Sequence, residues 1–167
     1  YQGAAFSFFK GFGSGNIAAH MQPNGTLFVG GTDRGWGARG GRRFALDRVT
    51  WTGEVPFEIH EMRAKPDGFE LTFTHEIDAI TAADLASYSM SAYTYIYRAD
   101  YGSPVVDKTI PKIVGAELKG PKTVRVTVDK LIQGHVHELR AKGVRSAKGL
   151  PILHPVGYYT LNEIPKK

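Results

Sequence analysis

The sequence predicts an all-β protein, built as a β-sandwich with an N-terminal β-hairpin module. Its 167 residues include 20 Gly, 9 Pro, 8 Tyr and 9 Phe, a composition that favours turns and strands over helices. Residues 69–73 and 124–128 alternate strictly between apolar and polar side chains, as half-buried strands do. Turn signals separate the predicted strands about every 8–12 residues, which is typical of a sandwich and not of a βαβ sheet.

The N-terminal module is expected to span residues 1–52. Pro23-Asn24-Gly25 is a strong turn signal, and the apolar segment 26–31 follows it directly, so we expect a β-hairpin here. A glycine-rich loop at 32–41 then leads into another strand at 42–51. We expect this module to pack on the sandwich or to complete one of its sheets.

The sandwich itself is expected to span residues 53–167. A short helical turn should interrupt it at 81–87, with Thr81 as its N-cap. In the closing strand, His135, His137 and Leu139 should share one face, with Glu138 on the other. The other strands are predicted at 57–62, 69–74, 88–97, 112–118 and 123–128.

Composition and charge narrow the function classes. The chain has no Cys, which excludes disulfides, thiolate metal sites and cysteine nucleophiles within it. The net charge of +5 is dispersed and does not form a basic element interleaved with stacking aromatics, so we expect no nucleic-acid partner. No apolar run reaches the length of a membrane span.

The order of motifs in the second module resembles bacterial Ig-like domains of the S-layer type. The resemblance rests on F-E-L-T-F-T at 69–74, V-R-V-T-V-D at 124–129 and G-V-R-S-A-K-G-L-P at 143–151. It implies an Ig-like sandwich in which position 137 is an inward aromatic position on the penultimate strand.

A wider resemblance covers nearly the whole chain. The phrases G-T-L-F-V-G-G-T-D-R-G-W-G at 25–37, V-T-W-T-G-E-V-P-F-E-I at 49–59, A-K-P-D-G-F-E-L-T-F at 64–73 and G-Y-Y-T-L-N-E-I-P at 157–165 carry it. They look like the C-terminal region of secreted bacterial glucose/sorbosone dehydrogenase-like β-propeller proteins.

That resemblance implies that residues 1–52 correspond to final propeller strands. The partner would be the remainder of a larger propeller and cytochrome protein, and the location would be periplasmic or extracellular. Pyrroloquinoline quinone (PQQ) would belong to the parent only, because one blade cannot form the central channel that holds it. We therefore assign no catalytic residue to this chain.

Three histidines form a candidate metal site. His135 and His137 point the same way from one strand, and His154 comes from the next hairpin strand. Imidazole is a ligand for both zinc and copper. The alternative is a structural histidine at position 137, buried in the core and satisfied by a backbone hydrogen bond.

The sequence also contains two groups of candidate ligand-binding residues. Tyrosines together with a carboxylate suit a carbohydrate-binding surface, because the rings stack on the C–H faces of sugars and the carboxylate accepts hydrogen bonds from sugar hydroxyls. The alternative is that one face of the predicted strand at 88–97 packs into the core. Arg34 and Trp36 in the glycine-rich loop could contact a ligand or form a cation–π pair that packs the loop. The carbohydrate candidates are Tyr93, Tyr95, Tyr97, Tyr101 and Asp107.

The function that we predict is a non-catalytic accessory or interaction domain of a secreted propeller-type protein. Its role would be to stabilise that protein or to attach it to a glycan or another partner. Two alternatives remain at this point: a copper- or zinc-binding redox accessory domain through the three histidines, and a free carbohydrate-binding module.

Overall fold

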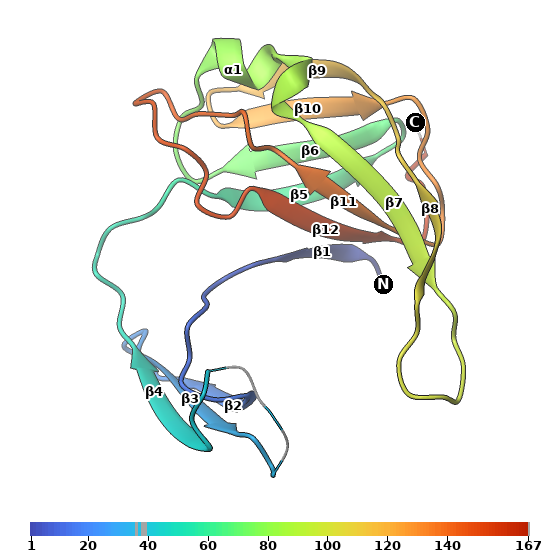
Figure 1. Ribbon diagram of the computed structural model, residues 1–167. Helices are drawn as coiled ribbons and strands as arrows, with labels where there is room; N and C mark the ends of the chain where they lie inside the picture. Colours follow the sequence, from blue (N-terminus) through green and yellow to red (C-terminus); the bar gives the residue numbers. More distant parts are fainter. Residues whose placement is uncertain (36, 38–39, 167) are drawn as a thin grey trace. The chain divides into compact units, whose positions relative to one another are not determined.

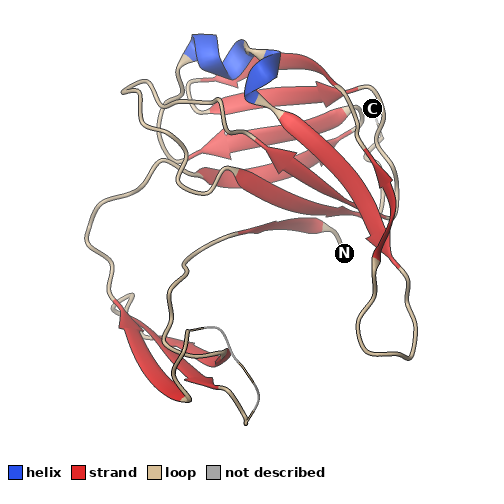
Figure 2. Ribbon diagram, viewed as in Figure 1, coloured by secondary structure: helices blue, strands red, loops and turns tan. Residues whose placement is uncertain are grey.

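The computed structural model describes residues 1–35, 37 and 40–166 and divides them into two compact units. One unit contains Tyr1–Ser7 together with the chain from Pro56 onward, and the other is Phe8–Val55. Nearly all regular structure is antiparallel β-sheet, so the predicted all-β sandwich class is confirmed (Figures 1 and 2). Among the described residues, no helix has the length and apolar character needed to cross a membrane.

The larger unit is the sandwich, made of two antiparallel sheets. Its five-stranded sheet has the order β1 (Gly3–Phe6), β12 (Val156–Leu161), β11 (His135–Arg140), β7 (Ser89–Tyr95) and β8 (Val105–Thr109). Its four-stranded sheet has the order β5 (Ile59–Lys65), β6 (Gly68–Phe73), β10 (Thr123–Val128) and β9 (Ile113–Gly120).

The core lies between these two sheets. Phe69 of β6 is fully buried, and its ring packs against Tyr159 and His137 of the opposite sheet at centroid distances of 5.2 and 5.4 Å. Gly68 allows β6 to approach β10, because a Cβ there would lie 2.0 Å from the carbonyl oxygen of Val126. The remaining inward positions are alternate residues of the strands, including Leu71, Phe73, Val124, Val126, Leu139 and Leu161.

A short helical connection joins the two sheets. Helix α1 (Ala79–Ala83) and the 3₁₀ turn η1 (Leu85–Ser87) link β6 to β7. The predicted cap is wrong: Asp78 is the N-cap, and its carboxylate accepts from the backbone N–H of Thr81 at 2.9 Å. A carboxylate three residues earlier is as good a cap as a threonine hydroxyl, so the helix begins sooner than expected.

The smaller unit is a three-stranded sheet in the order β2 (Asn16–Met21), β3 (Leu27–Thr32) and β4 (Phe44–Val49). The predicted turn joins β2 to β3, with Gly25 at φ +81° and the Gln22 N–H donating to the Thr26 carbonyl at 2.8 Å. The predicted strand at 42–51 supplies β4, so the module is a sheet of three strands and extends the expected hairpin.

The first strand belongs to the sandwich and not to the N-terminal module. β1 pairs antiparallel with β12, from Gly3 opposite Thr160 to Phe6 opposite Gly157, and Phe6 packs against the sandwich core. We expected one boundary between residues 52 and 53. The structure instead groups residues 1–7 with the chain from Pro56 onward, and the second unit is Phe8–Val55.

We predict that Phe69→Ala lowers the free energy of unfolding of the sandwich by about 3–5 kcal/mol, because it leaves a cavity between the two sheets. Chemical denaturation measures the change. Phe44→Ala is the matched control, since Phe44 is 71% exposed, and it should change stability by only about 0.5 kcal/mol. Equal losses for the two variants would contradict the assignment of Phe69 to the core.

The second prediction concerns β1. A chain in which a flexible Gly-Ser linker replaces residues 8–55 keeps β1 and should retain the stability of the sandwich. A chain lacking residues 1–55 loses β1, so β12 becomes an edge strand and its amide protons should exchange faster. Hydrogen exchange compares the two, and equal β12 protection in both chains would contradict the pairing of β1 with β12.

Candidate ligand-binding surface

The outer face of the five-stranded sheet carries three tyrosines and one carboxylate. Glu138 of β11 lies directly opposite Tyr158 of β12, and Val136 lies opposite Tyr93 of β7. Directly paired residues share a face, so these side chains project away from the core that holds His137. We call Tyr93, Tyr95, Glu138 and Tyr158 the tyrosine cluster.

Ring geometry defines the centre of the tyrosine cluster. Tyr93 and Tyr95 meet edge to face, with ring centroids 5.8 Å apart and an interplanar angle of 88°. Tyr93 is only 9% exposed, whereas Tyr95 is 51% exposed. Burial, and after it the neighbouring Tyr95 and Glu138, raise the pKa of the Tyr93 phenol to about 12. Tyr93 therefore stays neutral and supports Tyr95, whose ring is open to a ligand.

A polar pair lies beside these rings. Glu138 accepts from the Arg140 guanidinium, and the side chain of Glu138 is only 13% exposed. A carboxylate has about four lone-pair sites, so one ion pair leaves it able to accept further hydrogen bonds. The cluster thus combines an exposed ring face with a fixed acceptor.

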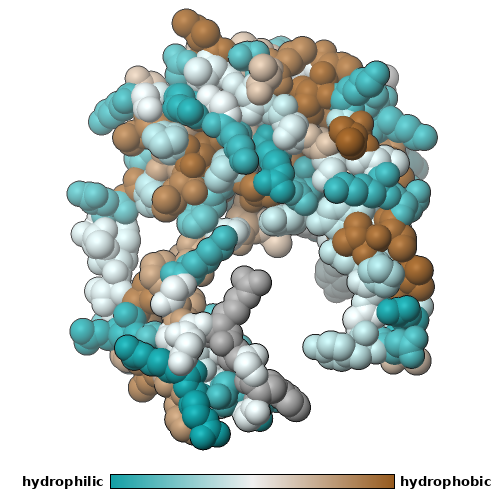
Figure 3. All heavy atoms as spheres, viewed as in Figure 1, coloured by the Kyte–Doolittle hydropathy of each residue, from teal (hydrophilic) through white to brown (hydrophobic). Residues whose placement is uncertain are grey.

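The β7–β8 hairpin extends the aromatic surface beyond the sheet. Figure 1 shows its long connection projecting from the sandwich, and Tyr97 and Tyr101 in that connection are fully exposed. The loop is held by its own hydrogen bonds: the Ile96 N–H donates to the Ser103 hydroxyl at 2.8 Å, and Arg98 Nε donates to the Gly102 carbonyl at 3.1 Å. In Figure 3 the hairpin carries both hydrophobic and hydrophilic surface.

Asp107, which we predicted as a ligand acceptor, is engaged by a histidine. Its carboxylate lies 2.9 Å from Nε2 of His135, and Nδ1 of His135 lies 3.2 Å from the Gln133 carbonyl. Asp107 has φ +53° at an irregularity in the pairing of β7 with β8. The pair ties β8 to the start of β11.

His137 lies in the core, as expected for an inward aromatic position. Its side chain is fully buried, and Nε2 accepts from the Ile132 N–H at 3.3 Å. The proton therefore sits on Nδ1, which has no hydrogen-bond partner among the described residues. Burial lowers the pKa of His137 to about 4, so the ring is neutral at physiological pH.

His154 has a different partner. Its Nδ1 lies 2.5 Å from one oxygen of Glu58, and its backbone N–H donates to the other oxygen at 2.9 Å. Each of the three histidines thus has its own environment. In the described part of the chain, no group of three or more His, Asp or Glu side chains is arranged to hold a metal ion.

The glycine-rich loop of the smaller unit lies beside an open depression. Arg34 has φ +50°, and its N–H donates to the Thr32 hydroxyl at 3.1 Å. Gly15, Asn16 and Asp33 contribute to the same depression. Trp36, the other candidate in this loop, lies outside the described residues.

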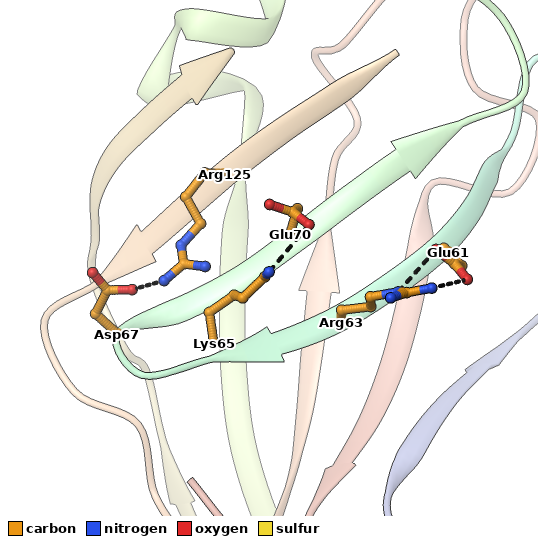
Figure 4. A network of polar contacts seen from close by, with 6 residues as sticks. All are labelled: Glu61, Arg63, Lys65, Asp67, Glu70 and Arg125. Carbon is orange, nitrogen blue, oxygen red and sulfur yellow. Dashed lines mark hydrogen bonds and ion pairs between the residues drawn. The ribbon is translucent and has the colours of Figure 1, made fainter. Parts of the chain in front are cut away.

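The outer face of the four-stranded sheet has a different chemistry. Figure 4 shows three ion pairs on it: Glu61 with Arg63 at 2.9 Å, Lys65 with Glu70 at 3.3 Å, and Asp67 with Arg125. Of these, Glu61 and Arg63 are both exposed, and an exposed pair of this kind contributes little to stability. The two outer faces of the sandwich therefore differ: the tyrosine cluster lies on the five-stranded sheet, and charged pairs lie on the four-stranded sheet.

The sequence indicated Tyr93, Tyr95, Tyr97 and Tyr101 but missed Glu138 and Tyr158. Alternation placed Glu138 on the face opposite His137, yet nothing in the sequence aligned it with Tyr158. The register of β11 with β12 brings these two side chains together. Comparison of the chain with protein-family models, curated proteins and solved structures finds no match.

We predict an acid-dependent loss of stability that originates at His137. The pKa of His137 is about 4 in the folded state and its ordinary value is 6.5, so the unfolded state binds more protons between these values. The free energy of unfolding therefore falls as the pH drops through this window, by about 3 kcal/mol in total. It is restored above pH 6.5.

Urea denaturation of the native chain and of His137→Phe, at a series of pH values, measures this effect. The variant keeps a ring against Phe69 and removes the titrating group, so its stability should depend less on pH in this window. Identical pH profiles for the two proteins would contradict a buried neutral His137.

Proposed function

We propose that this chain is a non-catalytic binding module that holds a carbohydrate against the tyrosine cluster and the hairpin tyrosines. The observation that carries the proposal is the exposed ring of Tyr95, which packs edge to face against Tyr93, together with the Glu138 carboxylate that acts on Tyr93 from the same face of the sheet. The outer face of the sheet thus combines an apolar stacking face with a hydrogen-bond acceptor.

The residue types favour a sugar over an apolar ligand. Tyrosine presents a large rigid face together with a hydroxyl, and it loses little conformational entropy when a ligand covers it. Sugars have the complementary pattern, with C–H groups on the ring faces and hydroxyls at the ring edge. Glu138 can accept from such hydroxyls while Arg140 holds the carboxylate in position.

The wider context of the proposal comes from sequence phrases. The segments at 25–37 and 49–59 resemble secreted bacterial dehydrogenase-like propeller proteins. On this proposal the chain is an accessory part of such a protein in the periplasm or outside the cell. It attaches that protein to a polysaccharide, and any PQQ chemistry belongs to the remainder of the parent.

Substitution of the exposed ring tests the binding function. Tyr95→Ala should weaken binding to a polysaccharide that the native chain retains by roughly fivefold to tenfold, because the stacking face is lost. Affinity electrophoresis in gels containing soluble β-glucan, xylan or glycol chitin measures the retardation. Trp51→Ala removes an exposed aromatic from the other unit and should leave the retardation unchanged. Equal retardation of Tyr95→Ala and the native chain would contradict the proposal.

A further inference from the structure

The exposed tyrosines follow the β7–β8 hairpin lengthwise. We propose that the ligand is an extended β-1,4-linked polysaccharide whose chain lies along this hairpin and is bound through several consecutive sugar units. This inference rests on the proposed carbohydrate-binding function and specifies the substrate class and the orientation in which it binds.

The direction follows from the order of the rings. Tyr93 and Tyr95 are alternate residues of β7, and alternate residues of a strand repeat about every 7 Å on one face. Tyr97 continues past the end of the strand, and Tyr101 lies in the same connection. The exposed rings of Tyr95, Tyr97 and Tyr101 therefore lead from the sheet to the hairpin loop, so a ligand that contacts all three must be elongated.

The exposure of the rings indicates a platform and not an end-binding pocket. Tyr97 and Tyr101 are fully exposed, so each can cover only one face of a sugar unit. A single unit on such a ring binds weakly. Once one unit is held at Tyr95, its linked neighbours are at high effective concentration near the loop rings, so affinity should rise with chain length.

The linkage follows from the shape of the chain. A β-1,4-linked polymer of gluco-configured sugars is a flat ribbon with equatorial hydroxyls at its edges and C–H groups on its faces. Such a ribbon can contact successive rings along the hairpin through the C–H groups of its faces, while its edge hydroxyls stay free to form hydrogen bonds. An α-1,4-linked glucan is curved and would meet fewer of these rings at once.

Calorimetric titration with the cello-oligosaccharides from disaccharide to hexasaccharide, and with the matching chitin oligosaccharides, tests this inference. In at least one series the hexasaccharide should bind roughly tenfold more tightly than the trisaccharide. In Tyr97→Ala/Tyr101→Ala this gain with chain length should disappear. Both side chains are fully exposed, so the double variant should fold, and circular dichroism checks that it does.

Two outcomes would overturn the inference, and they are distinguishable from each other. Equal affinity for short and long oligosaccharides, or preference for α-1,4-linked maltohexaose, would exclude the extended β-1,4 ligand and leave the carbohydrate-binding function intact. If the folded chain binds none of these oligosaccharides and shows no retardation in any polysaccharide gel, the binding function itself fails as well.

Discussion

The packing of Phe69 against His137 and Tyr159 is the contact on which the rest of the sandwich depends. It joins the two sheets at their centre, and all three side chains are buried. Because side chains alternate along a strand, an inward His137 forces Glu138 outward, and an inward Tyr159 forces Tyr158 outward. A shift of one residue in the register of β11 or β12 would exchange the inward and outward side chains of that strand. The core contact therefore also determines which residues form the tyrosine cluster.

Much of the fold could be predicted from local sequence pattern. The hairpin around Gly25 and the inward face of β11 follow from turn chemistry and from period-two alternation, both of which act between near neighbours in the chain. The pairing of β1 with β12 could not be predicted, because it joins opposite ends of the sequence and β1 is only four residues long. The cap of α1 was misassigned because Asp78 and Thr81 are both good cap residues and only backbone geometry distinguishes them.

The candidate site was predictable in part for the same reason. Tyr93 and Tyr95 stand on one strand, so their shared face is visible in the sequence. Glu138 and Tyr158 come from two other strands, and their place beside those rings depends on registers that no local pattern specifies. The spacing of the histidines suggested a single metal site. In the structure, His135 pairs with Asp107 and His154 pairs with Glu58, and both carboxylates are distant in sequence from their histidines.

The central claim is that the outer face of the five-stranded sheet, and not another surface, meets the ligand. An NMR titration of the labelled chain with cellohexaose or chitohexaose observes this directly. We predict that the ring signals of Tyr95, Tyr97, Tyr101 and Tyr158 shift in a saturable way, while those of the three-stranded sheet stay unchanged. Shifts confined to residues 8–55, or saturable binding that leaves these tyrosine signals unmoved, would contradict the claim.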